Sequence, residues 1–535
     1  MPTPPRPHAS APLHVATRVL DAGALTGLGH TAASAAGAVA EHAVVRGAPS
    51  FWLDSALPDA GEARWSIVGD AVDVLGEDAA DGSPEAVPSP GPRVLRRPDP
   101  RDAEAAWAEL AAASAPRPVV GGEGLPLRGG HVGFLGYELG LADLGVAPPP
   151  RAPADPAPLP ALFWLRPSRY AVVDHHDGSL TCCVVSLDAA AAERDVEAWA
   201  ARVRDALTVP RAHAAPAGDG GRAPSSSGVA GAAGGAQVAG RWREDRAAYT
   251  ALIERSHGAL REGESYELCL TTRFDVDPAV RVDPLVLFRD LAAHHPTPYA
   301  ALIEHGAGPD RWAVVSASPE RFLSGRDGRY STKPIKGTAA RHADPAEDAD
   351  AARALAADPK TRAENLMIVD LLRNDLTRVC VPGSVQVPSL MAVESYASVH
   401  QLVSTVTGRA LPGLTAVDVA RSLFPGGSMT GAPKRRTVEL LAQWEGAPRG
   451  VYSGALGLLS ADGACELSIV IRTAVLAPGA DDDATGGSGR WSIGAGGAIV
   501  ADSDADAEYD EVLLKAGALR RAFARVTGSG DARPS

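Results

Sequence analysis

The stretch Arg329-Tyr330-Ser331-Thr332-Lys333-Pro334-Ile335-Lys336-Gly337-Thr338 is the most informative part of this 535-residue chain. It places one lysine, Lys336, between Pro334-Ile335 and Gly337. Proline fixes φ and glycine permits close backbone approach, so the sequence predicts a rigid turn that aims the Lys336 ammonium at one point. A lysine desolvated in such a turn can lose its proton and become a nucleophile. Taken alone, the alternative is a solvated surface lysine.

Charge and composition narrow the class of protein. The formal net charge is −14 and 45% of the residues are hydrophobic. An acidic balance disfavours a nucleic-acid or anionic-membrane surface, and no run of about 18 apolar residues predicts a membrane span. The first residues, MPTPPRPHAS, lack the apolar core of a signal peptide. The five cysteines are scattered, as in a reduced protein. We therefore expect a cytoplasmic globular protein with no nucleic-acid and no membrane partner.

The chain divides by composition. We expect a disordered N-terminus over 1–13, a first folded region over 14–208, a flexible linker rich in Ala, Gly, Pro and Ser over 209–240, and a catalytic region over 241–528. Strands are predicted over 170–173 and 180–185 and a helix over 189–207. Residues 78–104 and 479–489 are predicted to be a surface insertion and a hairpin excursion. Strands and helices mix without regular βαβ alternation, which favours an α+β fold.

Several ordered blocks accompany the lysine. They are Ser318-Pro319-Glu320-Arg321-Phe322, Glu364-Asn365-Leu366-Met367-Ile368-Val369-Asp370, Phe424-Pro425-Gly426-Gly427-Ser428-Met429-Thr430-Gly431-Ala432-Pro433-Lys434, Arg449-Gly450-Val451-Tyr452-Ser453-Gly454, Ile471-Arg472-Thr473, Gly494-Ala495-Gly496-Gly497-Ala498-Ile499-Val500 and Glu508-Tyr509-Asp510-Glu511. Together they resemble the chorismate-utilising enzymes, which include the first components of anthranilate synthase and aminodeoxychorismate synthase and the isochorismate and salicylate synthases. The resemblance implies two large antiparallel β-sheets packed as a sandwich with helices outside, the N- and C-terminal segments interleaving into one body.

Two positions distinguish members of this family. Anthranilate synthases resemble the block around Lys336 but carry alanine there, whereas many aminodeoxychorismate synthases carry lysine. Isochorismate and salicylate synthases place a lysine at the position of Glu267, where it activates water as general base. Because this chain has Glu267 at that position, activation of water by a lysine there is unavailable. At both positions, the chain resembles component I of aminodeoxychorismate synthase.

Three glutamates are candidate metal ligands. Glu508 and Glu511 are three residues apart on one face of a predicted last helix, and Lys515 follows Glu511 at i+4. On spacing alone, the alternative is a solvated face with a Glu511–Lys515 ion pair. The resemblance implies that Mg²⁺ lies between Glu364 and these glutamates, with the ring carboxylate of chorismate as a further ligand. Oxygen ligands suit Mg²⁺.

The resemblance also assigns an acid and a carboxylate-binding set. Glu320 corresponds to the proposed acid that protonates the leaving C4 hydroxyl, a role favoured by a pKa raised towards 7; the alternative is an ion pair with Arg321. Gly494, Ala495, Gly496 and Gly497 can present backbone N–H groups as a glycine-rich nest. The residues implied to contact substrate are these four together with Tyr452, Arg472, Lys515, Ser428, Thr338 and Gln401.

One departure from the family concerns a histidine. Anthranilate synthases carry histidine in the sequence HLVS, where this chain has Gln401-Leu402-Val403-Ser404, and His400 stands one position earlier. One step along a strand reverses the side-chain face. We therefore expect His400 to be structural and Gln401, which cannot transfer a proton at neutral pH, to offer only a hydrogen bond.

The implied activity is amination of chorismate at C4. Lys336 attacks C2 as the C4 hydroxyl leaves, and ammonia then attacks C4 and expels Lys336, giving 4-amino-4-deoxychorismate for folate or a p-aminobenzoate-derived secondary metabolite. No cysteine lies in a Gly-x-Cys-x-Gly glutaminase motif, so a separate glutamine amidotransferase subunit is the expected source of ammonia.

Two alternatives remain. One is an anthranilate or 2-amino-2-deoxyisochorismate synthase, against which Lys336 argues. The other is a catalytically silent binding protein, because Leu53, Asp54 and Ser55 resemble a region that binds tryptophan in relatives. The retention of Glu320, Lys336, Glu364, Arg472 and Glu511 argues against a silent protein.

Overall fold

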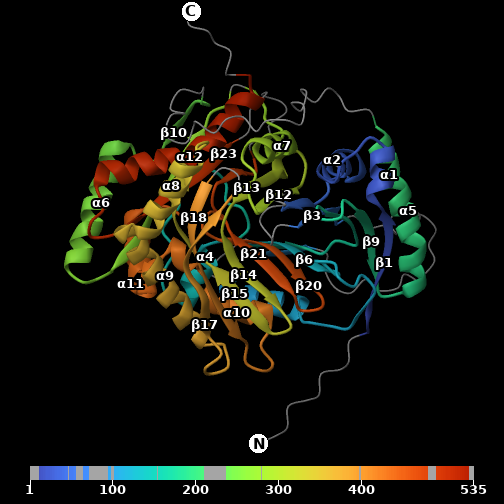
Figure 1. Cartoon of the computed structure of the whole chain (residues 1–535), viewed down its shortest axis with the longest axis horizontal. Coiled ribbons are helices and arrows are strands. Elements are labelled where there is room, and N and C mark those ends of the chain that lie inside the picture. The colour runs from blue at the N-terminus through green and yellow to red at the C-terminus, as the bar shows by residue number, and fades with distance from the viewer. Residues whose placement is uncertain are drawn as a thin grey trace, which may run out of the picture.

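Two large β-sheets with helices on their outer faces build the molecule (Figure 1). The computed structural model describes residues 11–45, 47–55, 64–71, 94–97, 102–153, 155–209, 237–278, 280–396, 399–479 and 490–528. Nearly all strand pairs are antiparallel, and within these residues only β1 and β5 pair in parallel. The α+β sandwich expected from the sequence is confirmed.

The larger sheet has thirteen strands in the order β10-β11-β23-β22-β13-β12-β2-β3-β8-β9-β1-β5, with β19 beside β11. They are β1 (Leu13–Leu20), β2 (Ser50–Asp54), β3 (Trp65–Asp70), β5 (Val119–Val120), β8 (Arg169–Asp174), β9 (Leu180–Ser186), β10 (Gly240–Trp242), β11 (Glu267–Val276), β12 (Tyr299–His305), β13 (Trp312–Ser318), β19 (Gly431–Ala432), β22 (Thr473–Leu476) and β23 (Trp491–Ile499).

The smaller sheet has ten strands in the order β16-β18-β15-β14-β21-β20-β6-β7-β4, with β17 beside β18. They are β4 (Val94–Arg97), β6 (Gly130–Leu135), β7 (Leu162–Leu165), β14 (Arg321–Arg326), β15 (Arg329–Lys333), β16 (Ile335–Ala340), β17 (Gln386–Ser395), β18 (Val399–Arg409), β20 (Ala455–Ser460) and β21 (Cys465–Ile469). Because β2 pairs with β12 and β6 pairs with β20, early and late segments interleave in both sheets.

Helices cover both outer faces. They are α1 (Ala22–Gly27), α2 (Ala32–Ala38), α3 (Ala103–Ala113), α4 (Glu138–Asp143), α5 (Ala189–Thr208), α6 (Arg246–Arg261), α7 (Pro284–His294), α8 (Pro345–Ala357), α9 (Pro359–Thr377), α10 (Ala416–Leu423), α11 (Lys434–Trp444) and α12 (Ala505–Val526), with short π- and 3₁₀-turns η1 (Val39–Ala43), η3 (Gly308–Asp310) and η4 (Gly427–Met429). None of the helices in the described part of the chain combines the length and apolar composition needed to cross a bilayer.

Three hydrophobic clusters correspond to the layers. One lies between the larger sheet and helices such as α5, α7 and α12, and a second lies between the smaller sheet and α3, α9 and α10. The third joins the facing surfaces of the two sheets, where Phe134 and Phe163 of the smaller sheet meet Trp312 of the larger one. Central strands such as β6, β8 and β13 are buried along their whole length, so each sheet has two apolar faces.

The local predictions have mixed outcomes. β8, β9 and α5 confirm the two predicted strands and the predicted helix, and β22 pairs with β23 as the hairpin that brackets 479–489. Three boundaries differ: β1 already begins at Leu13, and Val238, at the end of the predicted linker, is buried. The end of the insertion predicted over 78–104 also belongs to the fold, because β4 pairs with β7 and Ala103 of α3 is buried. Residues 1–10, 72–93, 210–236 and 480–489 lie outside the described residues, so the disorder, insertion and linker predictions there remain predictions.

The predicted turn around Lys336 is a strand with a bulge. In β16, Lys336 pairs with Leu402 of β18 and Thr338 with Gln401, so Gly337 is the extra residue. Gly337 has φ 74°, and a Cβ atom there would lie 2.4 Å from Cγ2 of Thr361 in α9. Only glycine adopts this left-handed conformation and fits against the helix without strain. The bulge therefore fixes the direction of Lys336 from a sheet, not from a loop.

Candidate active site between the two sheets

Lys336 lies in a buried cluster of charges where β16 of the smaller sheet meets β11 of the larger one. Its Nζ donates a hydrogen bond of 2.5 Å to Oε1 of Glu267, the first residue of β11, and lies 3.8 Å from Oε2 of Glu364 in α9. The side chains of Lys336 and Glu267 are 9% and 1% exposed. The alternative of a solvated surface lysine is therefore wrong.

The environment of Lys336 keeps its amine charged. Burial lowers the pKa of Lys336, but the carboxylates of Glu267 and Glu364 outweigh burial, and the pKa is raised above its ordinary value. The sequence-based expectation of a lysine neutralised by desolvation is thus corrected. The amine needs a proton acceptor before it can attack, and Glu267 is already hydrogen-bonded to it.

Glu267 is a candidate site residue that the sequence analysis does not identify. The sequence marks it only as a position that lacks the lysine of other family members, whereas the structure makes it the partner of Lys336. Its Oε2 atom is buried without a hydrogen-bond partner in the described residues. A buried carboxylate oxygen without a donor is costly, so this atom is placed to accept a hydrogen bond from a bound molecule.

The three candidate metal ligands lie on two helices, Glu364 on α9 and Glu508 and Glu511 on α12. Asp358 caps α9 by accepting a hydrogen bond from the Thr361 amide, and Asp504 caps α12 in the same way from Ala507. These caps fix the first turns that carry Glu364 and Glu508. Figure 1 shows α9 and α12 in the same part of the molecule, near β18 and β23.

Lysine ammonium groups lie among these carboxylates. Lys360 Nζ is 2.7 Å from Oε1 of Glu508 and 4.0 Å from Oε1 of Glu364, and Lys515 Nζ is 2.8 Å from Oε1 of Glu511. The Glu511–Lys515 ion pair predicted as the alternative is therefore present. Lys360, which the sequence interpretation did not single out, links the glutamates of the two helices.

The pKa values of two of the glutamates reflect the same arrangement. Burial raises the pKa of Glu364, and Lys336 and Lys360 only partly offset this effect. Burial also raises the pKa of Glu511, but Lys515, Lys360 and Lys336 outweigh it, so the pKa of Glu511 is lowered. Each glutamate is thus influenced by the same ammonium groups, which places both close to a shared cationic centre.

The donor set fits a hard divalent cation. No group of three or more His, Cys, Asp or Glu side chains is preassembled as a metal site within the described residues. The Lys360 ammonium nevertheless shows that a cation sits between Glu364 and Glu508, because it lies within 4.0 Å of both carboxylates. Carboxylate oxygens with room for water are the ligands that Mg²⁺ prefers.

Glu320 has the properties of a general acid. It follows β13, it is buried, and its backbone carbonyl accepts a hydrogen bond from the Ile469 amide. Burial raises its pKa to about 7, although a hydrogen bond from Ser428 and the charges of Lys336 and Lys515 act in the opposite direction. Arg321 pairs with Glu466 at 2.8 Å instead. The predicted alternative, a Glu320–Arg321 ion pair, is therefore wrong.

The glycine-rich block has a different geometry from the predicted nest. Gly494, Ala495, Gly496 and Gly497 all lie in β23 and pair with residues 270–273 of β11. On its other side, β23 pairs with β22 only as far as Ile493. Along residues 494–497, that side of β23 therefore has no partner strand among the described residues. The nest geometry is corrected to a strand edge, which can still offer backbone N–H groups.

These glycines serve packing as well. A Cβ atom at Gly494 would lie 2.2 Å from Cγ of Tyr452, and one at Gly497 would lie 3.2 Å from Oε2 of Glu508. Tyr452 therefore packs flat against the backbone of β23, which requires glycine at 494. Lys515 also donates a hydrogen bond of 2.8 Å to the carbonyl of Gly496. Tyr452, a candidate substrate-binding residue, and Glu508, a candidate metal ligand, therefore both lie against β23.

Arg472 is strained and desolvated. It has φ 49°, a conformation that non-glycine residues rarely adopt. Burial lowers the pKa of its guanidinium, and the carboxyl of Glu320 acts in the opposite direction. No carboxylate of the described residues comes within 4.0 Å of it to form an ion pair. A half-buried guanidinium in this setting is suited to capture a carboxylate from a ligand.

His400 and Gln401 behave as the register of β18 predicts. His400 Nε2 lies 3.0 Å from Oδ1 of Asp348 and its Nδ1 lies 2.8 Å from Oγ of Ser395. Asp348 in turn pairs with Arg341. His400 thus has a structural role in a polar cluster with α8, and Gln401, which pairs with Thr338 of β16, is buried and lies on the opposite face of the strand. The side chain of Thr338 is exposed.

The region resembling a tryptophan site is occupied by internal contacts. Asp54 accepts a hydrogen bond from Ser66, and Ser55 Oγ donates one of 2.5 Å to the carbonyl of Pro298. A role for Leu53, Asp54 and Ser55 in binding tryptophan stays a prediction.

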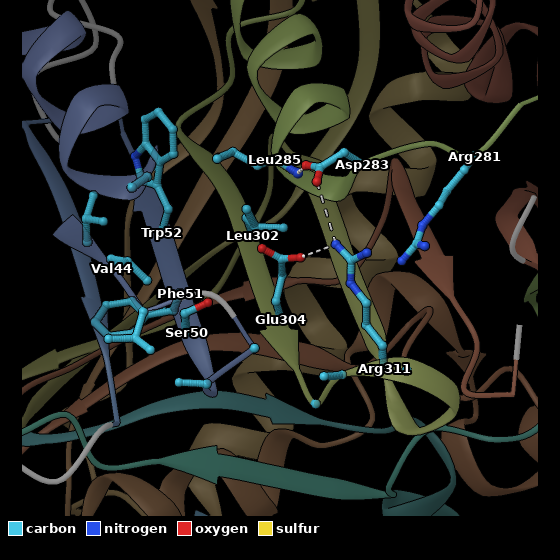
Figure 2. A pocket seen from close by; sticks show the side chains of 18 residues that line it. Val44, Ser50, Phe51, Trp52, Arg281, Asp283, Leu285, Leu302, Glu304 and Arg311 are labelled. Carbon is cyan, nitrogen blue, oxygen red and sulfur yellow. Dashed lines mark hydrogen bonds and ion pairs between the residues drawn. The ribbon is translucent and has the colours of Figure 1, made fainter. Parts of the chain in front are cut away.

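A cavity of about 550 Å³ opens at the other end of β2 (Figure 2). Ser50, Phe51 and Trp52 line it, together with Arg311, whose guanidinium lies 3.2 Å from Glu304. Leu53, Asp54 and Ser55 do not line this cavity.

The site brings a buried lysine close to Glu267 and Glu364, and comparison with known proteins shows the family to which the chain belongs. The family model described as chorismate binding enzyme matches residues 78–521, and the chain belongs to this family. An aminodeoxychorismate synthase from Streptomyces pristinaespiralis is 41% identical over 498 residues, which cover 90% of this chain and 63% of the relative. The chain therefore spans less than two thirds of the length of that relative.

Other members of the family are also similar. Anthranilate synthase component 1 of Streptomyces coelicolor is 37% identical over 410 residues, covering 75% of this chain and 74% of the relative. The crystal structure of anthranilate synthase component I from Streptococcus pneumoniae superposes with a TM-score of 0.65 and 26% identity, covering 85% of this chain and 92% of that one. Because the chain is similar to both kinds of synthase, the two activities have to be distinguished by the residues of the site.

Proposed function

We propose that this chain aminates chorismate at C4 with ammonia and Mg²⁺, giving 4-amino-4-deoxychorismate. The observation that carries the proposal is Lys336, whose Nζ is held in a buried site 2.5 Å from Glu267 and 3.8 Å from Glu364. Anthranilate synthases, which aminate C2, resemble this site but lack the lysine. The identity of the relative from Streptomyces pristinaespiralis supports the same reaction.

The first half of the reaction uses Glu267, Lys336 and Glu320. Lys336 Nζ gives a proton to Glu267 and attacks C2 of chorismate. Both ring double bonds shift, from C1=C2 and C5=C6 to C1=C6 and C4=C5, as the C4–O bond breaks and the hydroxyl leaves as water with the proton of Glu320. The pKa of about 7 held by Glu320 supports this role, because an acid in this range is protonated at neutral pH yet transfers its proton readily.

The second half reverses the shift. Ammonia attacks C4, both double bonds return to C1=C2 and C5=C6, and the C2–N bond to Lys336 breaks. Lys336 leaves with the proton that Glu267 held, and Glu320 takes a proton from the new C4 ammonium. The sum is chorismate and ammonia giving aminodeoxychorismate and water. Two displacements at opposite ends of the allylic system account for amination at C4.

Binding groups surround the reacting atoms. Glu364, Glu508 and Glu511 would hold Mg²⁺, which would neutralise the ring carboxylate of chorismate. Arg472, Tyr452 and the edge of β23 would bind the second carboxylate. Lys515 adds charge near the ring carboxylate. Ser428, Thr338 and Gln401 are further contacts carried by the family resemblance.

Ammonia is proposed to come from a separate glutamine amidotransferase subunit. All five cysteines of the chain are buried, and burial raises the pKa of each, as for Cys269 and Cys380. A glutaminase needs a reactive thiolate, which such cysteines do not supply. Unpaired cysteines also support a reducing, cytoplasmic compartment. The product would supply folate or a p-aminobenzoate-derived metabolite.

The test is product identification with a matched control. Purified protein is incubated with chorismate, Mg²⁺ and ammonium, and products are identified by mass spectrometry and NMR. The wild type is expected to give a C4-aminated product that retains the enolpyruvyl group. Lys336→Ala is expected to lose this product or divert to C2 amination. The control Lys333→Ala removes a nearby lysine that pairs with Glu394 and should keep C4 amination. Unchanged C4 product from Lys336→Ala would rule out the lysine as nucleophile.

A further inference from the structure

Lys360 holds a place that the proposed function assigns to a metal. Its ammonium lies 2.7 Å from Glu508 and 4.0 Å from Glu364, and its side chain is 41% exposed. Glu508, at 3% exposure, has one further hydrogen bond, from Ser503 at 2.6 Å. One cation therefore already bridges two carboxylates that come from different helices.

We propose that the Lys360 ammonium is a resident counterion that competes with the divalent cation for Glu364 and Glu508 and swings out to solvent when the metal binds. The inference rests on the proposed function, because it takes these glutamates as the metal ligands. Two cations cannot share the space between two carboxylates without strong repulsion. Without a counterion, the buried Glu508 carboxylate would be left with only the Ser503 hydroxyl, which is costly.

Lys360 is the lysine of this cluster that can leave. Lys336 is 9% exposed and is hydrogen-bonded to the fully enclosed Glu267. Lys515 has a second anchor in the carbonyl of Gly496. Lys360 has an exposed stem on the first turns of α9, and its described partners are only the two glutamates. A flexible side chain with one end in water can exchange its charge for another without rearranging the backbone.

The choice of lysine at this position supports displacement. The chain contains 51 lysine and arginine residues, of which only five are lysine, at 333, 336, 360, 434 and 515. Arginine would grip a carboxylate bidentately through a rigid fork, whereas lysine is a compact point charge. A chain that otherwise prefers arginine thus uses the more easily released cation between its metal ligands.

Metal titration of three variants tests the proposal. Mg²⁺ binding is measured by isothermal titration calorimetry on metal-free wild type, Lys360→Gln, Lys360→Arg and the control Arg373→Gln. Arg373 lies on the same helix and pairs with Asp370, so its replacement removes one positive charge away from the site. Lys360→Gln should lower the Mg²⁺ Kd about ten-fold or more, the change expected from removing a competing charge-assisted hydrogen bond. Lys360→Arg should raise it, and Arg373→Gln should leave it within about two-fold.

Amine labelling gives a second readout that does not depend on any variant folding. Lys360 is expected to react faster with an acylating reagent when Mg²⁺ is added, as followed by peptide mass spectrometry. Lys434, buried in an ion pair with Asp375 at 2.7 Å, is the internal reference and should not change.

The outcomes separate the two hypotheses. Equal or weaker Mg²⁺ binding by Lys360→Gln, with normal binding by the wild type, overturns the displacement inference alone. Labelling of Lys360 that Mg²⁺ leaves unchanged does the same. Absence of Mg²⁺ binding by the wild type and all variants, with and without chorismate, overturns the metal role in the proposed function and this inference with it.

Discussion

Replacing Lys336 by methionine should destabilise the protein by an amount that depends on pH. The substitution keeps the volume of the side chain but leaves Glu267, 1% exposed, without its ammonium partner. A buried carboxylate in this position avoids the desolvation penalty by taking up a proton. Protonating an ordinary glutamate, with a pKa of about 4.3, costs about 1.36 kcal/mol for each pH unit above that value.

The magnitude follows from that arithmetic. At pH 7 the difference is about 2.7 units, so the variant loses up to about 3.7 kcal/mol of unfolding free energy. At pH 5 the difference is about 0.7 units, and the loss shrinks to about 1 kcal/mol. The sign is set by Glu267: in the variant, the folded state holds a proton that the unfolded state releases, so the penalty grows as the pH rises from 5 to 7.

Equilibrium urea unfolding at both pH values measures the effect, with metal-free protein throughout. The double variant Glu267→Gln/Lys336→Met removes the unpaired carboxylate and should recover most of the loss at pH 7, because replacing both members of a buried pair is far less harmful than removing one. A penalty that is the same at pH 5 and pH 7, or a double variant as unstable as Lys336→Met, would refute the reasoning.

Two further outcomes follow from the site. The kcat/KM for chorismate, measured at constant free ammonia, should fall as the pH rises above about 7, because Glu320 then loses the proton that it must donate. Glu320→Gln should lower kcat by about 10²- to 10⁴-fold and abolish this fall at high pH. A pH profile that Glu320→Gln leaves unchanged would assign the acid to another group. Gly494→Ala should destabilise the protein by about 1–3 kcal/mol through overpacking and raise the KM for chorismate, because the added Cβ would lie 2.2 Å from the Tyr452 ring. The control Gly258→Ala on α6, whose Cβ would meet nothing within 4 Å, should not destabilise the protein. Circular dichroism melts and steady-state kinetics on both variants check the contrast.

The sequence predicts the local features of this fold better than its long-range contacts. Alternation and helical periodicity gave β8, β9 and α5, and the i+4 spacing of Glu511 and Lys515 gave their ion pair. The family resemblance placed Glu320 and Glu364 in one site. Each of these depends on residues near one another in the chain, or on blocks whose order is preserved.

The pairing of Lys336 with Glu267 could not be predicted in this way. The two residues are 69 positions apart, and they meet only because the fold brings β16 of the smaller sheet to β11 of the larger one. Lys360 and Glu508 are 148 positions apart and meet through two helices. The glycines of 494–497 were misinterpreted because a glycine run suits both a nest and a strand packed against a tyrosine ring, and only the register of β23 decides between them.

The contact between positions 267 and 336 gives a structural reason for the chemistry that the resemblance suggests. The family resemblance implies that isochorismate and salicylate synthases carry, at the position of Glu267, a lysine that activates water. Here the two side chains are joined by a hydrogen bond of 2.5 Å, so a lysine on β11 and a lysine on β16 would deliver their amines within one hydrogen-bond length of the same point.

A lysine on β16 in place of one on β11 therefore keeps a buried amine in this part of the site and places the Glu267 carboxylate next to it. An amine beside a carboxylate that can take its proton is suited to attack carbon itself. An amine without such a partner in a similar place is suited to activate a water molecule. In the proposed mechanism, this exchange of one charge between β11 and β16 changes the nucleophile without changing the fold.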